Sequence, residues 1–174
     1  MKLTNYHHSF LKKISHFFYG KTISDLILIS DEDDDLIDNV RFFELEFSDV
    51  VGFYINGSNP LISINHIDEF DDFNLYASYS ALSESKERNF LPFKVDFIKV
   101  FFHPEYNEVI SIFLSSSDFS FSVSIVFSTD EIHTHINCKK DYLTKIIKED
   151  LVQFEGIEFL ICQMDSSNDD WSLI

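Results

Sequence analysis

The order of apolar and polar positions predicts a helix near the start of the chain. Apolar side chains recur there at spacings of four, four and three residues, so they share one face of a helix over residues 4–19. Thr4 is suited to cap the start of this helix, and Gly20 is suited to end it. The apolar face consists of Tyr6, Phe10, Ile14 and Phe17.

Most of the remaining chain shows the patterns of short strands. One run alternates strictly, with Phe43, Leu45 and Phe47 on one face and two glutamates on the other. This alternation predicts a half-buried strand whose apolar face meets the core. The predicted strands cover residues 22–29, 41–47, 50–55, 61–67, 93–102, 109–114, 119–127, 131–137 and 154–164.

Residues 93–128 have the clearest pattern, with three strands joined by tight turns that predict an antiparallel meander. We expect its serine face to meet solvent or small side chains. A second helix is predicted near 141–149. These elements predict an α+β fold with a mainly antiparallel sheet of about six to eight strands. No linker divides the chain. Residues 1–164 would form one compact domain, and 165–174 a mobile acidic tail.

Charge narrows the classes of partner. Thirty acids oppose thirteen bases, which gives a net charge of −17. This charge disfavours binding to nucleic acid, whose phosphates need lysine and arginine, and to anionic lipid headgroups. It favours basic proteins and speeds encounter with them. The bases are unevenly spread, because residues 1–24 hold four lysines and no acid.

Other features indicate a cytoplasmic protein. Cys138 and Cys162 are the only cysteines, too few for the disulfide framework of a small secreted domain. No apolar run approaches the roughly 20 residues that a membrane span needs. The N-terminal segment has no uninterrupted apolar stretch of the kind found in a signal peptide.

No motif indicates an enzyme. Asp31, Asp33 and Asp35 have the spacing of the first EF-hand ligands, but Leu36 and Phe42 stand where that loop requires Gly and Glu. The chain also lacks the Gly-x-Ser-x-Gly motif of a nucleophilic serine. We therefore expect a protein without catalytic activity and without a cofactor.

One transition-metal site is a candidate. Glu131, His133 and His135 stand at every second position, so on a strand all three would point to one face. Two imidazoles and a carboxylate can bind zinc or iron and leave coordination positions open. Cys138 lies nearby in the sequence. The alternative interpretation is an exposed strand face with scattered polar residues.

Two acidic clusters are the candidate partner-binding residues. Together with nearby aromatic side chains they would steer and then anchor a basic protein. The clusters consist of Asp31, Glu32, Asp33, Asp34 and Asp35, and of Asp68, Glu69, Asp71 and Asp72.

The overall character of the chain resembles the immunity proteins of bacterial polymorphic and contact-dependent toxin systems, which are small, often acidic α+β proteins of the cytosol. The resemblance rests on size, charge and composition and on no motif, so it transfers no functional residue. It implies a one-to-one inhibitor that binds a toxin domain, often a basic nuclease. Two alternatives remain open: a metal-dependent enzyme that uses Glu131, His133 and His135, and a nucleic-acid mimic that blocks a DNA-binding protein.

Overall fold

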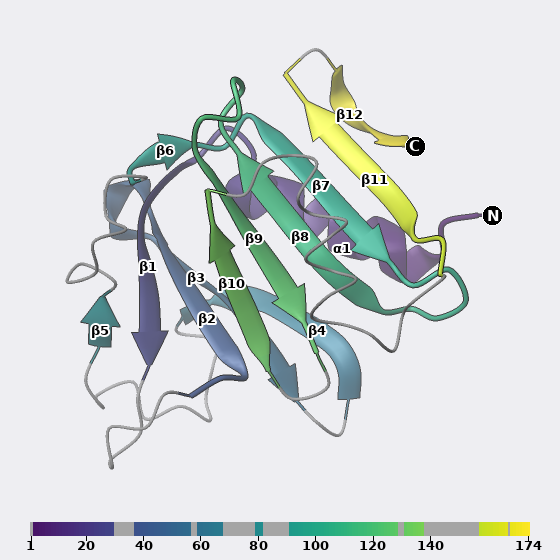
Figure 1. Cartoon of the computed structure of the whole chain (residues 1–174), viewed down its shortest axis with the longest axis horizontal. Helices are drawn as coiled ribbons and strands as arrows, with labels where there is room; N and C mark the ends of the chain where they lie inside the picture. The colour runs from purple at the N-terminus through teal and green to yellow at the C-terminus, as the bar shows by residue number, and fades with distance from the viewer. Residues whose placement is uncertain are drawn as a thin grey trace.

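The fold is α+β, as predicted, with one α-helix, one 3-10 turn and twelve strands among the described residues (Figure 1). The strands form two antiparallel sheets. The predicted helix near 141–149 lies outside the described residues. The computed structural model describes residues 2–29, 37–56, 59–67, 79–81, 91–128, 131–137, 157–166 and 168–174.

Helix α1 (Asn5–Phe18) begins and ends where the sequence predicts. The Thr4 hydroxyl accepts a hydrogen bond from the His7 amide (3.4 Å), and the Thr4 amide donates to His7 Nδ1 (3.2 Å). This is a capping box with a histidine in place of the usual glutamate. Gly20 ends the helix with a φ of 74°, a left-handed conformation that glycine adopts without strain. The buried face consists of His7, Phe10, Leu11, Ile14 and Phe18.

The first sheet has the strand order β4-β3-β2-β1-β5, and β6 also pairs with β1. Its first four strands are joined in sequence order, as expected for hairpins in an antiparallel sheet. The strands are β1 (Thr22–Ile29), β2 (Val40–Leu45), β3 (Val50–Asn56), β4 (Asn59–His66), β5 (Tyr79–Ala81) and β6 (Phe93–Lys94).

The second sheet has the order β10-β9-β8-β7-β11-β12. Its central three strands form the predicted meander, and β10 extends it as a fourth strand. The strands are β7 (Phe97–Phe102), β8 (Val109–Ser115), β9 (Ser122–Phe127), β10 (Ile132–Ile136), β11 (Leu160–Asp165) and β12 (Asn168–Leu173).

Three sequence expectations need correction. The chain builds two sheets, where we expected one sheet of about six to eight strands. The run 93–102 is not one strand, because it pairs first with β1 and then, after Val95 and Asp96, with β8 and β11. The expected tail also differs from the structure, since β12 pairs with β11 as an edge strand. Trp171 of β12 packs against the main core, which explains why this polar segment joins the sheet.

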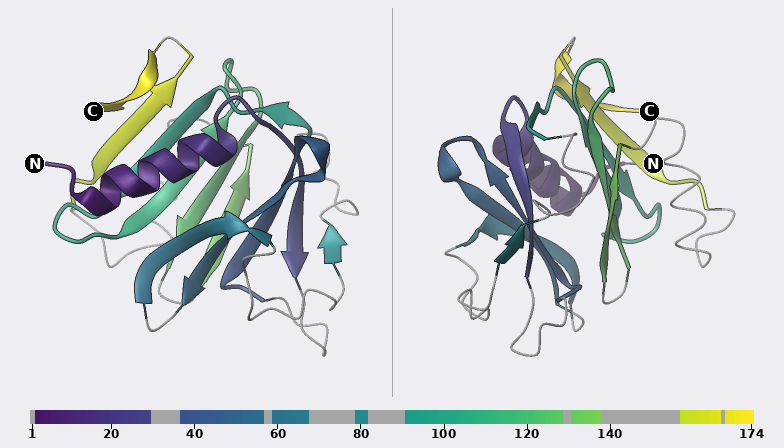
Figure 2. Two further views of the ribbon diagram at one scale, coloured as in Figure 1. Left: turned by 180° about the vertical axis from the view of Figure 1, so that it is seen from behind. Right: turned by 60° about the vertical axis from the view of Figure 1, so that its left-hand side comes forward.

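The core lies between the two sheets, with α1 inserted between them (Figure 2, right). Phe18 of α1 stacks on Phe53 of the first sheet at a ring-centroid distance of 5.5 Å. Phe43 meets both rings edge-on, and Phe127 of the second sheet lies 5.8 Å from Phe53. Aromatic pairs add to the stabilisation from apolar burial, so these rings connect all three layers.

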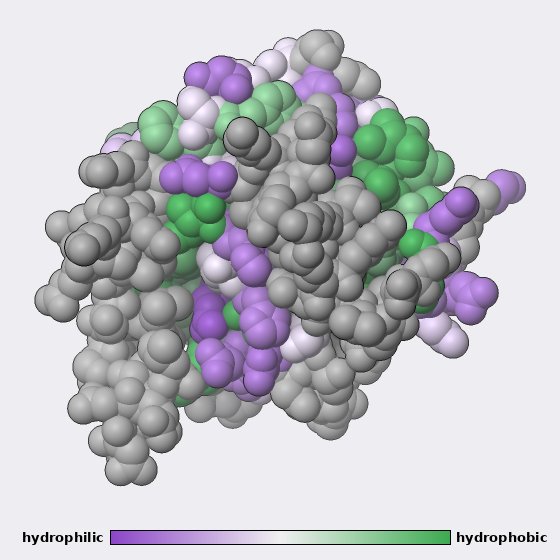
Figure 3. All heavy atoms as spheres, viewed as in Figure 1, coloured by the Kyte–Doolittle hydropathy of each residue, from purple (hydrophilic) through white to green (hydrophobic). Residues whose placement is uncertain are grey.

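The outer face of the second sheet is buried as well. Phe97, Phe101 and Phe113 lie there with almost no exposure. The serine face of the meander belongs to this side and is a small-residue contact, in which the Ser111 and Ser124 hydroxyls lie 3.5 Å apart. Figure 3 views the molecule from this side, where hydrophilic residues gather over β10 and apolar ones show near β11 and β12.

Candidate partner-binding surface

The two acidic clusters predicted to bind a partner, 31–35 and 68–72, lie outside the described residues. Their positions relative to each other therefore stay a prediction. Of the acids near the C-terminus, Asp165 is half-buried at the end of β11, and Asp170 is exposed on the edge strand β12.

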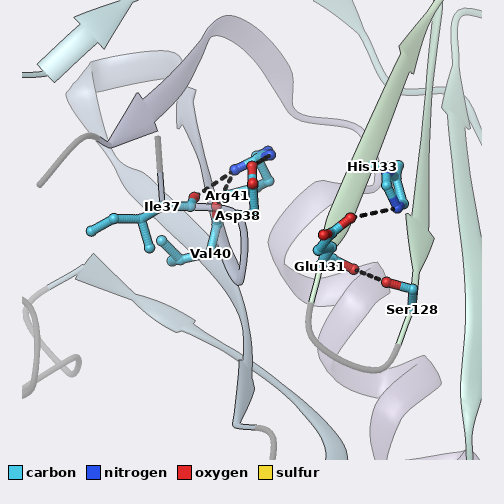
Figure 4. Close-up of polar contacts among 7 residues, drawn as sticks. All are labelled: Ile37, Asp38, Val40, Arg41, Ser128, Glu131 and His133. Carbon is cyan, nitrogen blue, oxygen red and sulfur yellow. Dashed lines mark hydrogen bonds and ion pairs between the residues drawn. The ribbon is translucent and has the colours of Figure 1, made fainter. Parts of the chain in front are cut away.

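The structure brings together two of the three predicted metal ligands (Figure 4). Glu131 lies just before β10, and its Oε2 is 3.3 Å from His133 Nε2. His133 and His135 alternate with core residues of β10, so they share one face as predicted. No group of three metal-ligating side chains lies close enough for an ion within the part of the chain that is described. Cys138 lies outside that part.

A buried arginine near this pair was not found by sequence reasoning. Arg41 of β2 is 7% exposed, and its Nη1 donates to the carbonyl oxygens of Ile37 (2.9 Å) and Val40 (2.8 Å). Its Nη2 donates to Asp38 Oδ1 at 3.1 Å (Figure 4). Asp38 also accepts, through its carbonyl oxygen, a hydrogen bond of 2.7 Å from the Ile132 amide of β10. These contacts give Arg41 a structural role, because they hold the entry to β2 and link the two sheets.

The most unusual surface residue is Phe47, in the turn between β2 and β3. The 3-10 turn η1 (Glu46–Ser48) reverses the chain, and the Leu45 amide donates to the Asp49 carbonyl at 2.6 Å to close it. Phe47 has a φ of 65° and a ψ of 25°, and it is 96% exposed. We call residues 46–49 the Phe47 turn.

Our expectation that Phe47 faces the core was wrong. Strand β2 ends at Leu45, and residues 46–49 form the turn. Phe47 therefore belongs to the turn, although it continues the alternation of apolar and polar residues in the sequence. A bulky residue in the left-handed region is strained, and Gly or Asn would suit this position better. A fully exposed phenyl ring also gains nothing from burial. The exposed ring contributes little to folding, so it is a candidate contact residue for a partner.

Acidic residues flank Phe47 in the sequence and at the adjoining strand ends. Glu46 and Asp49 belong to the same turn, and Glu44 pairs across from Val50 at the adjoining strand ends. The Asp49 Oδ1 atom lies 2.9 Å from His66 Nδ1 of β4, which fixes the carboxylate at the base of the turn. The Phe47 turn therefore holds one exposed aromatic side chain and two acidic residues, Glu46 and Asp49.

No helix among the described residues is both long and apolar enough to cross a membrane. Comparison of the chain with models of known protein families, with curated proteins and with solved structures gave no match.

Proposed function

We propose that this chain is an acidic cytoplasmic binding protein that inhibits a basic protein partner, and that it acts as an immunity protein against a cognate bacterial toxin. The observation that carries this proposal is the strained, exposed Phe47 ring among carboxylates. The net charge of −17 supports it, because long-range attraction would bring a basic partner to the acidic surface.

The energetics of binding fit this arrangement. Aromatic side chains that enter a pocket of the partner supply most of the affinity in many interfaces, while charges at the rim set the association rate. Burying one phenyl ring contributes roughly 1.5–3 kcal/mol. The turn already holds Phe47 in one backbone conformation, so little conformational entropy remains to be lost on binding.

The first test is affinity purification from the native host at low and at moderate salt, followed by expression of the co-purifying protein alone and together with this chain. We expect a single basic partner that arrests growth alone and is neutralised by the chain. A partner whose binding does not weaken with salt, or which has no toxicity, would contradict the proposal.

The second test asks whether Phe47 anchors that partner. The variant Phe47→Asn keeps a residue that tolerates the left-handed turn, and we expect its affinity to fall by about tenfold or more, mainly through faster dissociation. Tyr106→Asn is the matched control, because Tyr106 is another exposed aromatic (63%) in a different turn. Equal affinity of both variants and the wild type would remove Phe47 from the interface.

A further inference from the structure

A cleft between α1 and β4 has the opposite character to the rest of the protein. Its volume is about 510 Å³, within the range of small-molecule sites. Figure 2 (left) shows α1 lying across the molecule with β4 beside it. The cleft is lined by Ser9, Lys12, Lys13, His16, Phe17 and Asn65.

The polar lining includes two lysines and contains no carboxylate. Lys13 Nζ lies 3.3 Å from Asn65 Oδ1, so this ammonium group is held at the wall formed by β4. Lys12 is exposed and has no ion-pair partner among the described residues. The cleft therefore offers two fixed charges and several donors to an anion.

One wall of the cleft is apolar. Phe17 is half-buried, and its ring meets the imidazole of His66 edge-on at a centroid distance of 4.9 Å. This contact fixes the orientation of the Phe17 ring. A flat face next to two ammonium groups suits a ligand that carries a negative charge at one end and a planar group at the other.

The plain alternative is a solvated basic helix face, and the charge pattern argues against it. Lys12 and Lys13 are adjacent, and no acid stands three or four residues from either of them on the helix. A chain with thirty acids places none of them within residues 1–24 to offset these charges. Lysines that have no acidic partner on their own helix are available to bind an anion in the cleft.

We propose that the α1–β4 cleft binds a small organic phosphate. The phosphate group lies between the ammonium groups of Lys12 and Lys13, and the planar part of the ligand contacts the Phe17 ring. Lysine binds phosphate as a point charge. The two lysines carry two positive charges, which match a phosphate group better than a carboxylate with its single negative charge. This site is separate from the Phe47 turn, so it goes beyond the proposed inhibitor function.

The test is titration of the ¹⁵N-labelled protein with adenosine monophosphate, with inorganic phosphate and adenosine as the two partial ligands. We expect saturable shifts at Ser9, His16 and Asn65 with adenosine monophosphate, and affinities at least about tenfold weaker with either fragment alone. Lys12→Gln/Lys13→Gln should weaken binding about tenfold or more, while Lys2→Gln/Lys21→Gln, which removes two exposed lysines outside the cleft, should not. Phe47→Asn should leave this binding unchanged, which separates it from partner binding.

Three results would overturn the proposal. The first is the absence of shifts in the cleft at millimolar adenosine monophosphate. The second is equal binding by wild type and by the Lys12→Gln/Lys13→Gln variant, with circular dichroism confirming that both are folded. The third is saturable binding of an acidic peptide such as oligoglutamate at the cleft with none of the nucleotide, which would assign the cleft to a protein segment.

Discussion

Replacing Phe47 by Asn should make the protein more stable while weakening its binding to a partner. The ring is 96% exposed, so its removal costs almost no packing. A bulky residue in the left-handed region costs about 1–2 kcal/mol, and Asn is among the residues that adopt this region most readily. We therefore expect the free energy of unfolding to rise by about 0.5–1 kcal/mol, which corresponds to about 1–4 °C in Tm for a chain of this size.

Urea unfolding followed by circular dichroism, together with thermal scans, measures this change. Tyr106→Asn is the control, since Tyr106 is exposed but has a negative φ, and we expect no gain in stability from it. A loss of stability in Phe47→Asn would refute the reasoning, because it would show that the ring packs against the protein. A gain in stability without any loss of affinity would show that the strain serves no interface.

Three further predictions concern the core and its titrating groups. Phe53→Ala should lower the free energy of unfolding by about 3–5 kcal/mol in urea titrations, because Phe53 contacts the rings of α1 and of both sheets. Burial raises the pKa of the Cys162 thiol to about 11, so a Cys138→Ser variant should react with Ellman's reagent only after unfolding, and prompt reaction of the native protein would contradict this. Burial also lowers the pKa of His7, with the Tyr106 backbone opposing the shift, so the unfolded chain binds the proton more readily. The free energy of unfolding should therefore fall as pH drops from about 6.5 towards the lowered pKa. The variant His7→Gln keeps a capping residue that does not titrate, so it should flatten this pH dependence in urea titrations at pH 5 to 7. An unchanged pH dependence would exclude His7 as its source.

Local signals in the sequence predicted most of the elements but not how they are layered. Helix α1 was predictable because its caps, Thr4 and Gly20, act within a few residues of the helix they bound. The point at Val95 where the chain passes from one sheet to the other was not predictable. The Val95 amide donates to the Lys21 carbonyl and the Val95 carbonyl accepts from the Gly20 amide, each at 2.8 Å, and both partners are remote in sequence. Both sheets require apolar residues, so composition does not mark where the chain passes from one to the other.

The candidate surface was harder to predict than the fold. In the sequence, Phe47 continues the alternation of apolar and polar residues that begins in β2. It is exposed because the chain turns at residues 46–49, and the alternation does not show where that turn begins. One signal in the sequence could have shown this turn. The next strand begins at Val50, so a strand that continued to residue 47 would leave too few residues for a loop between the two strands. The α1–β4 cleft combines helix residues with Asn65 of β4, and no local spacing relates these positions.

The opposite charges of the two surfaces constrain how a partner can bind. Asp49 of the Phe47 turn contacts His66, and His66 contacts Phe17 at the edge of the cleft, so the acidic and basic surfaces adjoin. A basic partner attracted to the Phe47 turn is repelled by Lys12 and Lys13. In the proposed complex, that repulsion would turn the partner away from α1 and restrict its orientation on the turn. In that complex the cleft would stay open to a small anion, and a bound phosphate would reduce the repulsion at that edge.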